Sequence, residues 1–139
     1  MAWGVNERFD FEAPTLAAGE LGAVHFIAIG GSGMSGIAAF LHDLGVSVTG
    51  CDGADSGVVE RLRARGIPVE IGHDPAHLAG VDTIVVSSAI QESNAELTAA
   101  RGAGVRVLHR AQALASAMGA DTRVAVAGAN GKTTTSAML

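Results

Sequence analysis

The chain has 139 residues and a formal net charge of −5, with 48% hydrophobic but only 4% aromatic residues. A chain of this length fits one domain that buries roughly two thirds of its unfolded surface. The acidic balance and the scattered Lys and Arg residues argue against nucleic acid as a partner. The lone Cys51 excludes an internal disulfide, and no apolar run is long enough to span a bilayer. Because the N-terminus does not resemble a signal peptide either, we expect no membrane partner and a cytoplasmic protein.

The hydrophobic pattern predicts alternating strands and helices. Residues 1–20 show no periodicity and are predicted to be a leader or flexible arm. From residue 24 onward, short apolar runs alternate with stretches of helical spacing. Strands are predicted at 24–29, 46–50, 67–72, 82–89, 105–109 and 122–128, and helices at 32–45, 56–66, 94–104 and 110–119. This succession predicts an α/β, Rossmann-like, doubly wound and mainly parallel sheet with helices on both faces.

A first glycine-rich loop, GGSGMSG at 30–36, follows the first predicted strand. Gly31, Gly33 and Gly36 fit the GxGxxG pattern, in which the glycines turn the chain, admit a diphosphate and permit close helix packing. Asp52 lies about 20 residues further on, where a carboxylate usually accepts hydrogen bonds from a sugar hydroxyl. From this pattern alone NAD is the obvious ligand. The alternatives are glycines that serve packing only and an Asp52 that caps a turn.

A second glycine-rich loop, GANGKTT at 128–134, lies near the end of the chain. It is a shortened P-loop, since Val126 stands where the standard pattern requires glycine. Its amides are predicted to wrap the phosphates of ATP, while Lys132 neutralises the β and γ oxygens and Thr133 binds Mg²⁺. The alternative is a tight turn with an exposed lysine. The predicted ATP-binding residues are Gly128, Ala129, Asn130, Gly131, Lys132, Thr133 and Thr134.

Together the two loops resemble those of the Mur ligase family. The similarity extends over about residues 22–139 and rests on six segments that follow the family's order: HFIAIGGSGMSGIA at 25–38, TGCD at 49–52, GHD at 72–74, VVSSAIQESNAEL at 85–97, VLHRAQALA at 107–115 and VAVAGANGKTTT at 124–135. The first loop is most similar to that of the alanine-adding members, where it holds the diphosphate of a UDP-sugar. Two positions depart from their pattern: Ala129-Asn130 replaces Thr-His, and Ala28 replaces a glycine.

The resemblance implies a three-domain enzyme of peptidoglycan synthesis that joins L-alanine to UDP-N-acetylmuramate with ATP and Mg²⁺. In such a ligase the lactyl carboxylate accepts the γ-phosphoryl group, and the amine of alanine attacks the acyl phosphate. Catalysis then rests mainly on positioning and charge neutralisation. Residues 21–122 are predicted to be the UDP-sugar-binding domain and residues 123–139 the start of a truncated ATP-binding domain. The fragment by itself is therefore expected to be inactive and to need no cofactor.

The resemblance also suggests which residues form the sites. Lys132 is expected to be catalytic, and Thr133 to bind the metal. The UDP-sugar is expected to contact Gly31, Ser32, Gly33, Met34, Ser35, Asp52, His73, Ser87, Ser88 and Arg110. The last three follow the carboxyl ends of predicted parallel strands, where such sheets bind ligands.

Each assignment has a simpler alternative. His73 would be a solvated loop histidine, the two serines would satisfy local amides, and Arg110 would pair with a helix or with a neighbouring acid. The four other histidines show no metal-ligand spacing, and Cys51 is expected to pack as a small apolar residue.

Two other functions compete with the ligase. An NAD(P)-binding domain of a dehydrogenase or regulatory protein would place Asp52 against an adenine ribose and would tolerate removal of residues 128–139. A small non-enzymatic nucleotide sensor would bind ATP within this chain alone. The second is disfavoured because a P-loop without further carboxylates leaves the Mg²⁺ shell incomplete.

Overall fold

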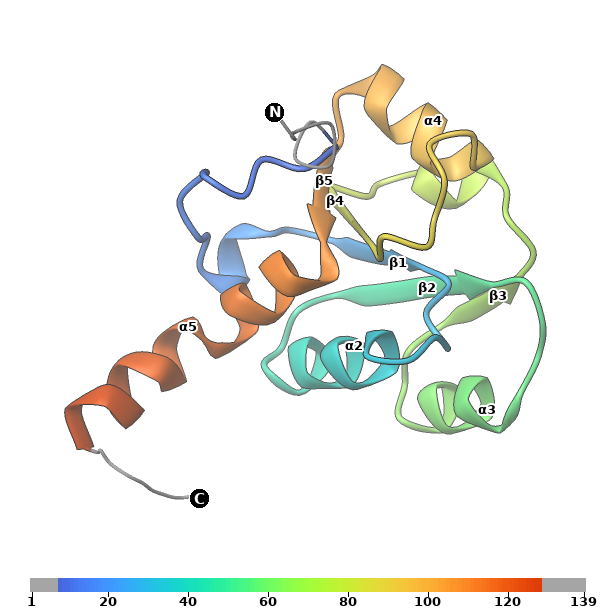
Figure 1. Ribbon diagram of the computed structural model, residues 1–139. Helices are drawn as coiled ribbons and strands as arrows, with labels where there is room; N and C mark the ends of the chain where they lie inside the picture. Colours follow the sequence, from blue (N-terminus) through green and yellow to red (C-terminus); the bar gives the residue numbers. More distant parts are fainter. Residues whose placement is uncertain (1–7, 129–139) are drawn as a thin grey trace.

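A computed structural model describes residues 8–128, with side chains described up to residue 119. One sheet of five parallel strands has the order β3-β2-β1-β4-β5 (Figure 1). The strands are β1 (Val24–Ile27), β2 (Val48–Asp52), β3 (Val69–Ile71), β4 (Thr83–Val86) and β5 (Arg106–His109). Val24 of β1 lies opposite both Val48 of β2 and Thr83 of β4. The predicted α/β, doubly wound parallel sheet is confirmed.

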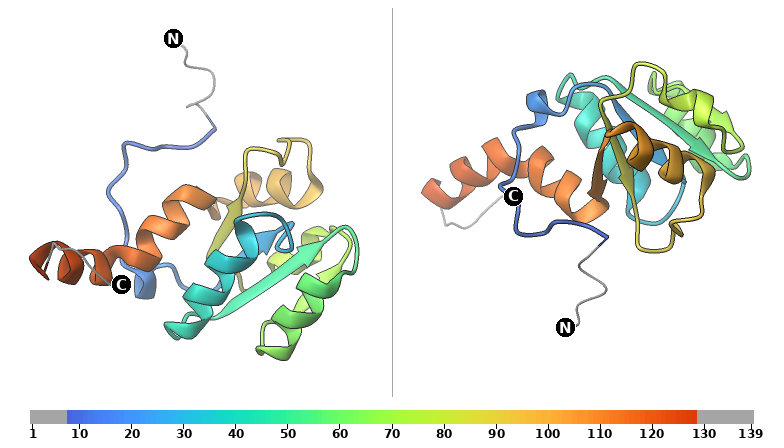
Figure 2. Two further views of the ribbon diagram at one scale, coloured as in Figure 1. Left: turned by 60° about the horizontal axis from the view of Figure 1, so that its bottom comes forward. Right: turned by 90° about the horizontal axis from the view of Figure 1, so that it is seen from above.

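Helices cover both faces of this sheet. They are η1 (Ala18–Glu20), α2 (Met34–Asp43), α3 (Gly57–Ala64), η2 (Pro75–Leu78), α4 (Ala95–Ala103) and α5 (Arg110–Gly128). Figure 1 places α2 and α3 below the sheet and α4 above it, and the tilted view in Figure 2 agrees. Side-chain caps begin several helices: Ser56 Oγ accepts a hydrogen bond from the Val59 amide, and Asn94 Oδ1 accepts from Glu96 and Leu97.

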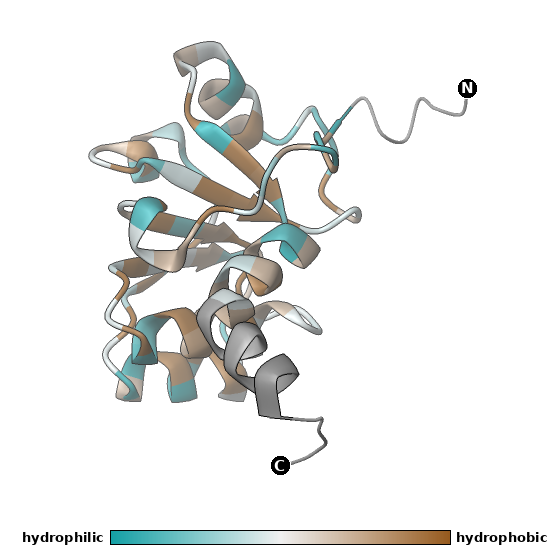
Figure 3. Cartoon of the chain, turned by 90° about the vertical axis from the view of Figure 1, so that its left-hand side faces the viewer, coloured by the Kyte–Doolittle hydropathy of each residue, from teal (hydrophilic) through white to brown (hydrophobic). Residues whose placement is uncertain are grey.

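Two apolar cores lie on the two faces of the sheet. Phe26 and Ile27 are adjacent in β1, are both fully buried, and point to opposite faces. The core around Phe26 packs against α2, α3 and α5, whereas the core around Ile27 packs against α4. The strands are accordingly the brown, hydrophobic centre of Figure 3. A sheet buried on both faces explains why the strands appear in the sequence as continuous apolar runs.

The described part of the N-terminal arm packs against the end of the sheet. The Phe9 side chain is only 5% exposed, and its ring centroid lies 5.1 Å from that of His109. Arg8 Nε contacts Glu92 at 2.8 Å, and Glu92 also pairs with Arg101 Nε at 2.6 Å. Residues 8 and 9 therefore tie the arm to α4 and to the loop before it.

The predicted strand at 122–128 is wrong. That segment continues α5, which starts at Arg110 and ends at Gly128. The stretch is rich in alanine, which has the highest helix propensity, and within the described residues no strand lies alongside it to pair with. Gly128 is therefore the last residue of a helix rather than part of a turn after a strand. The division of the chain at residue 122 stays a prediction.

No helix in residues 8–128 combines the length and the apolar character that a bilayer span needs.

Candidate functional site

The candidate site lies where the chain reverses its direction across the sheet. From β1 the chain proceeds to β2 and β3 on one side, then crosses to β4 and β5 on the other. Parallel sheets bind ligands outside the carboxyl ends of their strands at such a switch point. The glycine loop follows β1, Asp52 ends β2, Ser87 follows β4, and Arg110 follows β5. The structure thus brings residues from four predicted segments to one edge of the sheet.

The glycine loop turns sharply between β1 and α2. Ala28 has a φ of 62° and Gly33 a φ of 78°, both in the left-handed region. The amide of Gly31 donates to the Ala28 carbonyl at 3.0 Å, and the amide of Met34 donates to the Gly31 carbonyl at 3.0 Å. Within residues 8–128, the amides of Ser32 and Gly33 have no protein acceptor. Free amides at the start of a helix are a ready site for an anion.

Arg110 supplies a cation beside these free amides. A Cβ atom added to Gly33 would lie 3.0 Å from Arg110 Nη1, so the guanidinium lies close against the loop at this glycine. Arg110 is exposed, and in the described part of the chain it forms no ion pair. The expected alternative, pairing with a nearby acid, is therefore not observed. Free amides and an unpaired guanidinium together favour a phosphate or diphosphate.

Asp52 holds the glycine loop in place. Its Oδ2 accepts a hydrogen bond from the Gly30 amide at 2.8 Å, and its Oδ1 accepts from the Ala54 amide at 3.3 Å. A Cβ atom on Gly30 would lie 2.9 Å from Oδ2, so only glycine permits this approach. Asp52 thus caps a turn through the Ala54 amide, which is the alternative role considered for it. Its hydrogen bond with the Gly30 amide also links the end of β2 to the glycine loop.

Two serines and a histidine border the same edge. Ser87 Oγ accepts from the Ala89 amide at 3.3 Å, which is the local role considered as its alternative. Ser88 Oγ lies 3.0 Å from His109 Nε2, at the end of β5. Burial first, and then the positive charges of Arg110 and Arg8, lower the pKa of His109. This ring is therefore neutral at neutral pH and available for a hydrogen bond with Ser88.

The third glycine of the pattern does not act as predicted. Gly36 is exposed, and a Cβ atom there would meet nothing within 4 Å. Close packing is required instead at Gly50 in β2, where a Cβ atom would collide with the Ile29 side chain. Gly36 therefore lies on an exposed side of α2, away from the sheet contacts that the pattern implies.

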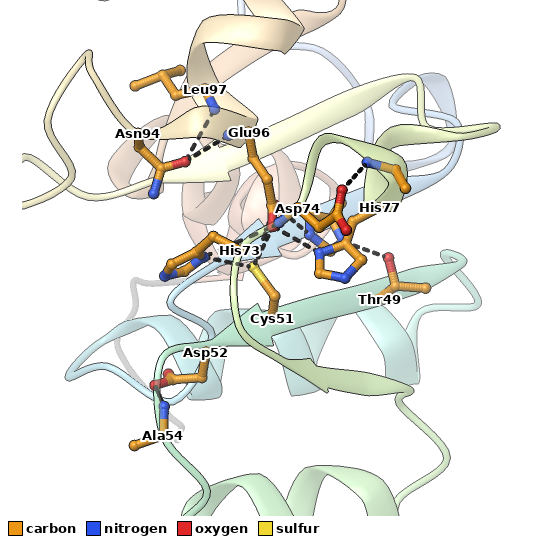
Figure 4. A network of polar contacts seen from close by, with 12 residues as sticks. Thr49, Cys51, Asp52, Ala54, His73, Asp74, His77, Asn94, Glu96 and Leu97 are labelled. Carbon is orange, nitrogen blue, oxygen red and sulfur yellow. Dashed lines mark hydrogen bonds and ion pairs between the residues drawn. The ribbon is translucent and has the colours of Figure 1, made fainter.

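A buried polar cluster lies next to Asp52, around its chain neighbour Cys51 and Glu96 (Figure 4). The Glu96 carboxylate is fully buried, and it accepts hydrogen bonds from His25 Nε2 at 2.9 Å, His77 Nδ1 at 2.7 Å and the Asp74 amide at 2.9 Å. The Cys51 thiol lies 3.1 Å from Glu96 Oε2 and 3.2 Å from His73 Nδ1. Burial disfavours the charge on Glu96, but the hydrogen bonds from His25, the Asp74 amide, Cys51 and His77 outweigh it and lower the pKa of Glu96 to about 2.

Sequence reasoning missed this cluster. Burial, and then the nearby Glu96, raise the pKa of the Cys51 thiol, so it is neutral and is not simply an apolar filler. His73 is 31% exposed on its side chain and contacts the cluster rather than standing in solvent. The sequence signal that would have indicated the cluster is His25, a histidine in the otherwise apolar strand β1. It lies two residues before Ile27, and Ile27 pairs with Cys51 of β2.

Several predicted residues lie outside the described part of the chain. Of the second glycine loop, only the backbone of Gly128 is described. The positions of Ala129, Asn130, Gly131, Lys132, Thr133 and Thr134 are not described, so their predicted roles toward ATP and Mg²⁺ stay predictions.

Comparisons with known proteins show the family to which the chain is similar. The family model described as "Mur ligase family, catalytic domain" matches residues 23–122. The UDP-N-acetylmuramate–L-alanine ligase of Kineococcus radiotolerans is 57% identical over 122 residues, covering 86% of this chain and 26% of the relative. The ligase of the same name from Halorhodospira halophila is 50% identical over 143 residues, covering 100% of this chain and 29% of the relative.

Solved structures give the same result. The UDP-N-acetylmuramate-alanine ligase from Thermotoga maritima matches with a TM-score of 0.67 at 26% identity, over 71% of this chain and 23% of that one. A murein peptide ligase from Psychrobacter arcticus matches with a TM-score of 0.64 at 27% identity, over 67% of this chain and 20% of that one. The chain thus spans about a quarter of the length of the curated relatives it matches.

Proposed function

The chain belongs to the Mur ligase family, and we propose that its sheet binds UDP-N-acetylmuramate within an ATP-dependent ligase that adds L-alanine to this sugar nucleotide. The observation that carries the proposal is that the amides of Ser32 and Gly33 and the nearby Arg110 guanidinium have no partner among the described residues 8–128. Relatives that match over most of this chain carry the name of this ligase.

The loop and Arg110 would hold the diphosphate. A diphosphate carries charge over several oxygens, so two amides at the start of α2 and one guanidinium give it both hydrogen bonds and charge compensation. The edge of the loop also includes Gly31, Met34 and Ser35, whose backbones set its curvature. Asp52 keeps this loop in register through the Gly30 amide.

The uridine and the sugar would lie on either side of the diphosphate. Asp52 and His73 are proposed to face the uridine, since Asp52 ends β2, His73 follows the neighbouring strand β3, and a Cβ atom on Gly53, the residue after Asp52, would lie 4.0 Å from His73 Nε2. Ser87 and Ser88, which follow β4, are proposed to line the opposite rim. The switch point between β1 and β4 would separate the two ends of the ligand.

The reaction itself needs parts outside the described residues. ATP and Mg²⁺ are assigned to residues 128–134, with Lys132 neutralising phosphate charge, Thr133 binding the metal, and the lactyl carboxylate passing through an acyl phosphate. Because the chain spans about a quarter of its relatives, we expect no ligase activity from these 139 residues alone. The enzyme is proposed to act in the cytoplasm.

Calorimetric titration of the 139-residue chain tests the proposal. UDP-N-acetylmuramate should bind and NADH should not. Arg110→Ala should weaken UDP-N-acetylmuramate binding by roughly tenfold or more, as expected for loss of a charged hydrogen bond. Arg61→Ala, which removes an exposed arginine on α3, is the matched control and should leave the affinity unchanged. Binding of NADH with no response to UDP-N-acetylmuramate would overturn the proposal in favour of a dinucleotide-binding domain.

A further inference from the structure

Four metal-ligating side chains converge behind the β2 end of the sheet. His25, Cys51, His77 and Glu96 each offer one ligand atom, and these four atoms all lie within 4.8 Å of one another. They come from β1, β2, η2 and α4, so segments far apart in the sequence meet at one point. His25, Cys51 and Glu96 are buried, and the side chain of His77 is 18% exposed.

We propose that these four residues form a binding site for Zn²⁺. The donor set contains one sulfur, two imidazole nitrogens and one carboxylate oxygen, all of which are common protein ligands of zinc. Four protein ligands and no open position correspond to a structural site rather than a catalytic one. The site is separate from the proposed diphosphate loop, because none of its four ligands belongs to residues 28–36.

The distances are compatible with an ion at the centre. His25 Nε2 and His77 Nδ1 lie 2.9 and 2.7 Å from the two Glu96 oxygens, and Cys51 Sγ lies 3.1 Å from Oε2. Zinc–ligand bonds of about 2.0–2.3 Å in a tetrahedron put the ligand atoms roughly 3.3–3.8 Å apart. The close pairs would therefore move apart and the pairs that are up to 4.8 Å apart would move together, each by about 1 Å or less and without a change of fold.

Proton positions can adapt to the ion. Binding would release one proton, from the Cys51 thiol, and form the Zn–S bond, while Glu96 is already ionised. Each imidazole would carry its remaining proton on the nitrogen that faces away from the ion. For His25 that nitrogen is Nδ1, which lies 2.9 Å from Thr49 Oγ1, an acceptor that would fix the ring. Thiolate and carboxylate together would balance the charge of the ion.

An entry path leads to the cluster. A pocket of about 370 Å³ is lined by His25, Thr49 and His77, among other residues. Both His25 and His77 line this pocket, and His77 is the most exposed of the four ligands. A hydrated ion would meet this histidine first, and the three buried ligands would follow.

Zinc and cobalt titrations of the intact chain test the site. With Zn²⁺ competing against a chromogenic chelator, we expect one equivalent to bind and to protect the Cys51 thiol from a thiol reagent. With Co²⁺, a thiolate-to-cobalt charge-transfer band should appear. Cys51→Ser should abolish that band, and His77→Asn should lower the zinc affinity by at least about tenfold.

His42→Asn is the matched control, since His42 lies at the end of α2 and takes no part in the cluster. It should bind zinc as the unaltered chain does. Circular dichroism checks that each variant is folded; if Cys51→Ser does not fold, the partly exposed His77→Asn still decides the test. Failure of the unaltered chain to bind one equivalent, or unchanged affinity in His77→Asn, would overturn the proposal.

Discussion

The glycine loop and the Glu96 cluster are two polar regions that differ in how their hydrogen bonds are satisfied. Among residues 8–128, the loop leaves the amides of Ser32 and Gly33 without an acceptor and places Arg110 beside them without an ion pair. In the cluster, by contrast, hydrogen bonds from His25, Cys51, His77 and the Asp74 amide converge on the buried carboxylate of Glu96. Unsatisfied groups at a surface are suited to binding an anion, whereas satisfied groups in a core stabilise the fold. The comparison predicts that substitutions in the cluster affect stability and that substitutions in the loop affect binding.

The largest expected effect is the loss of the Glu96 charge. Glu96→Gln would leave the donors of His25, His77 and the Asp74 amide facing an amide group in a buried site. We expect a fall of about 3 kcal/mol in the free energy of unfolding, measured by urea denaturation in the presence of a chelator. Glu60→Gln, at a side chain that is 65% exposed, should change it by less than about 0.5 kcal/mol. Equal effects of the two changes would remove the distinction between the regions.

Acid should act on the same carboxylate. The folded-state pKa of Glu96 is about 2, below its ordinary value of 4.5, so the unfolded chain binds the proton first as the pH falls. The stability that this group contributes is fully present above pH 4.5 and is lost between pH 4.5 and 2. A shift of this size corresponds to roughly 3 kcal/mol. Unfolding free energies measured across this window should show a flatter slope in Glu96→Gln; an unchanged slope would contradict the assignment.

Substitutions at two glycines of the first loop test whether the loop, unlike the cluster, controls ligand binding. Gly33→Ala would force a left-handed residue and bring a Cβ atom to 3.0 Å from Arg110 Nη1, so we expect about 1–2 kcal/mol lower stability and loss of UDP-N-acetylmuramate binding. Gly36→Ala, where a Cβ atom meets nothing, should bind as before and gain up to about 1 kcal/mol from helix propensity. Calorimetry and thermal unfolding measure both. Similar losses of binding in the two variants would argue against a specific role for the Gly33 backbone.

The smallest expected effect is at Ala28, which has a φ of 62° in the left-handed region that favours glycine. Ala28→Gly would relieve left-handed strain of about 1 kcal/mol but increase the entropy of the unfolded chain by a similar amount. We therefore expect a change within about 0.5 kcal/mol in the urea midpoint analysis. A Val at this position is the contrasting variant, because a β-branched side chain cannot relax there and should cost more than 1 kcal/mol, on the order of the left-handed penalty.

Particular elements show how far sequence reasoning reached. The strand at β1 and the loop after it were predictable, because a buried parallel strand is a continuous apolar run and the turn needs glycine. Gly36 was predicted to permit close packing between helix and strand, but the close contact is at Gly50 with Ile29. Which glycine is needed depends on the position of the helix relative to the sheet, which is set by the tertiary fold. The segment 122–128 was predicted as a strand from its valines, yet it continues α5. A strand requires a neighbouring strand to pair with, and the local sequence pattern does not show whether one is present.

By itself the sequence determined the class of fold, the position of the first glycine loop and the family, because these depend on local periodicity and on ordered motifs. Only the tertiary structure decided what His25, Cys51, His77 and Glu96 do. Their spacing along the chain carries no metal or ion-pair pattern, and they become neighbours only when β1, β2, η2 and α4 fold together. The same holds for Arg110 above Gly33, because a contact between residues 77 positions apart is created by the sheet order, not by the local sequence.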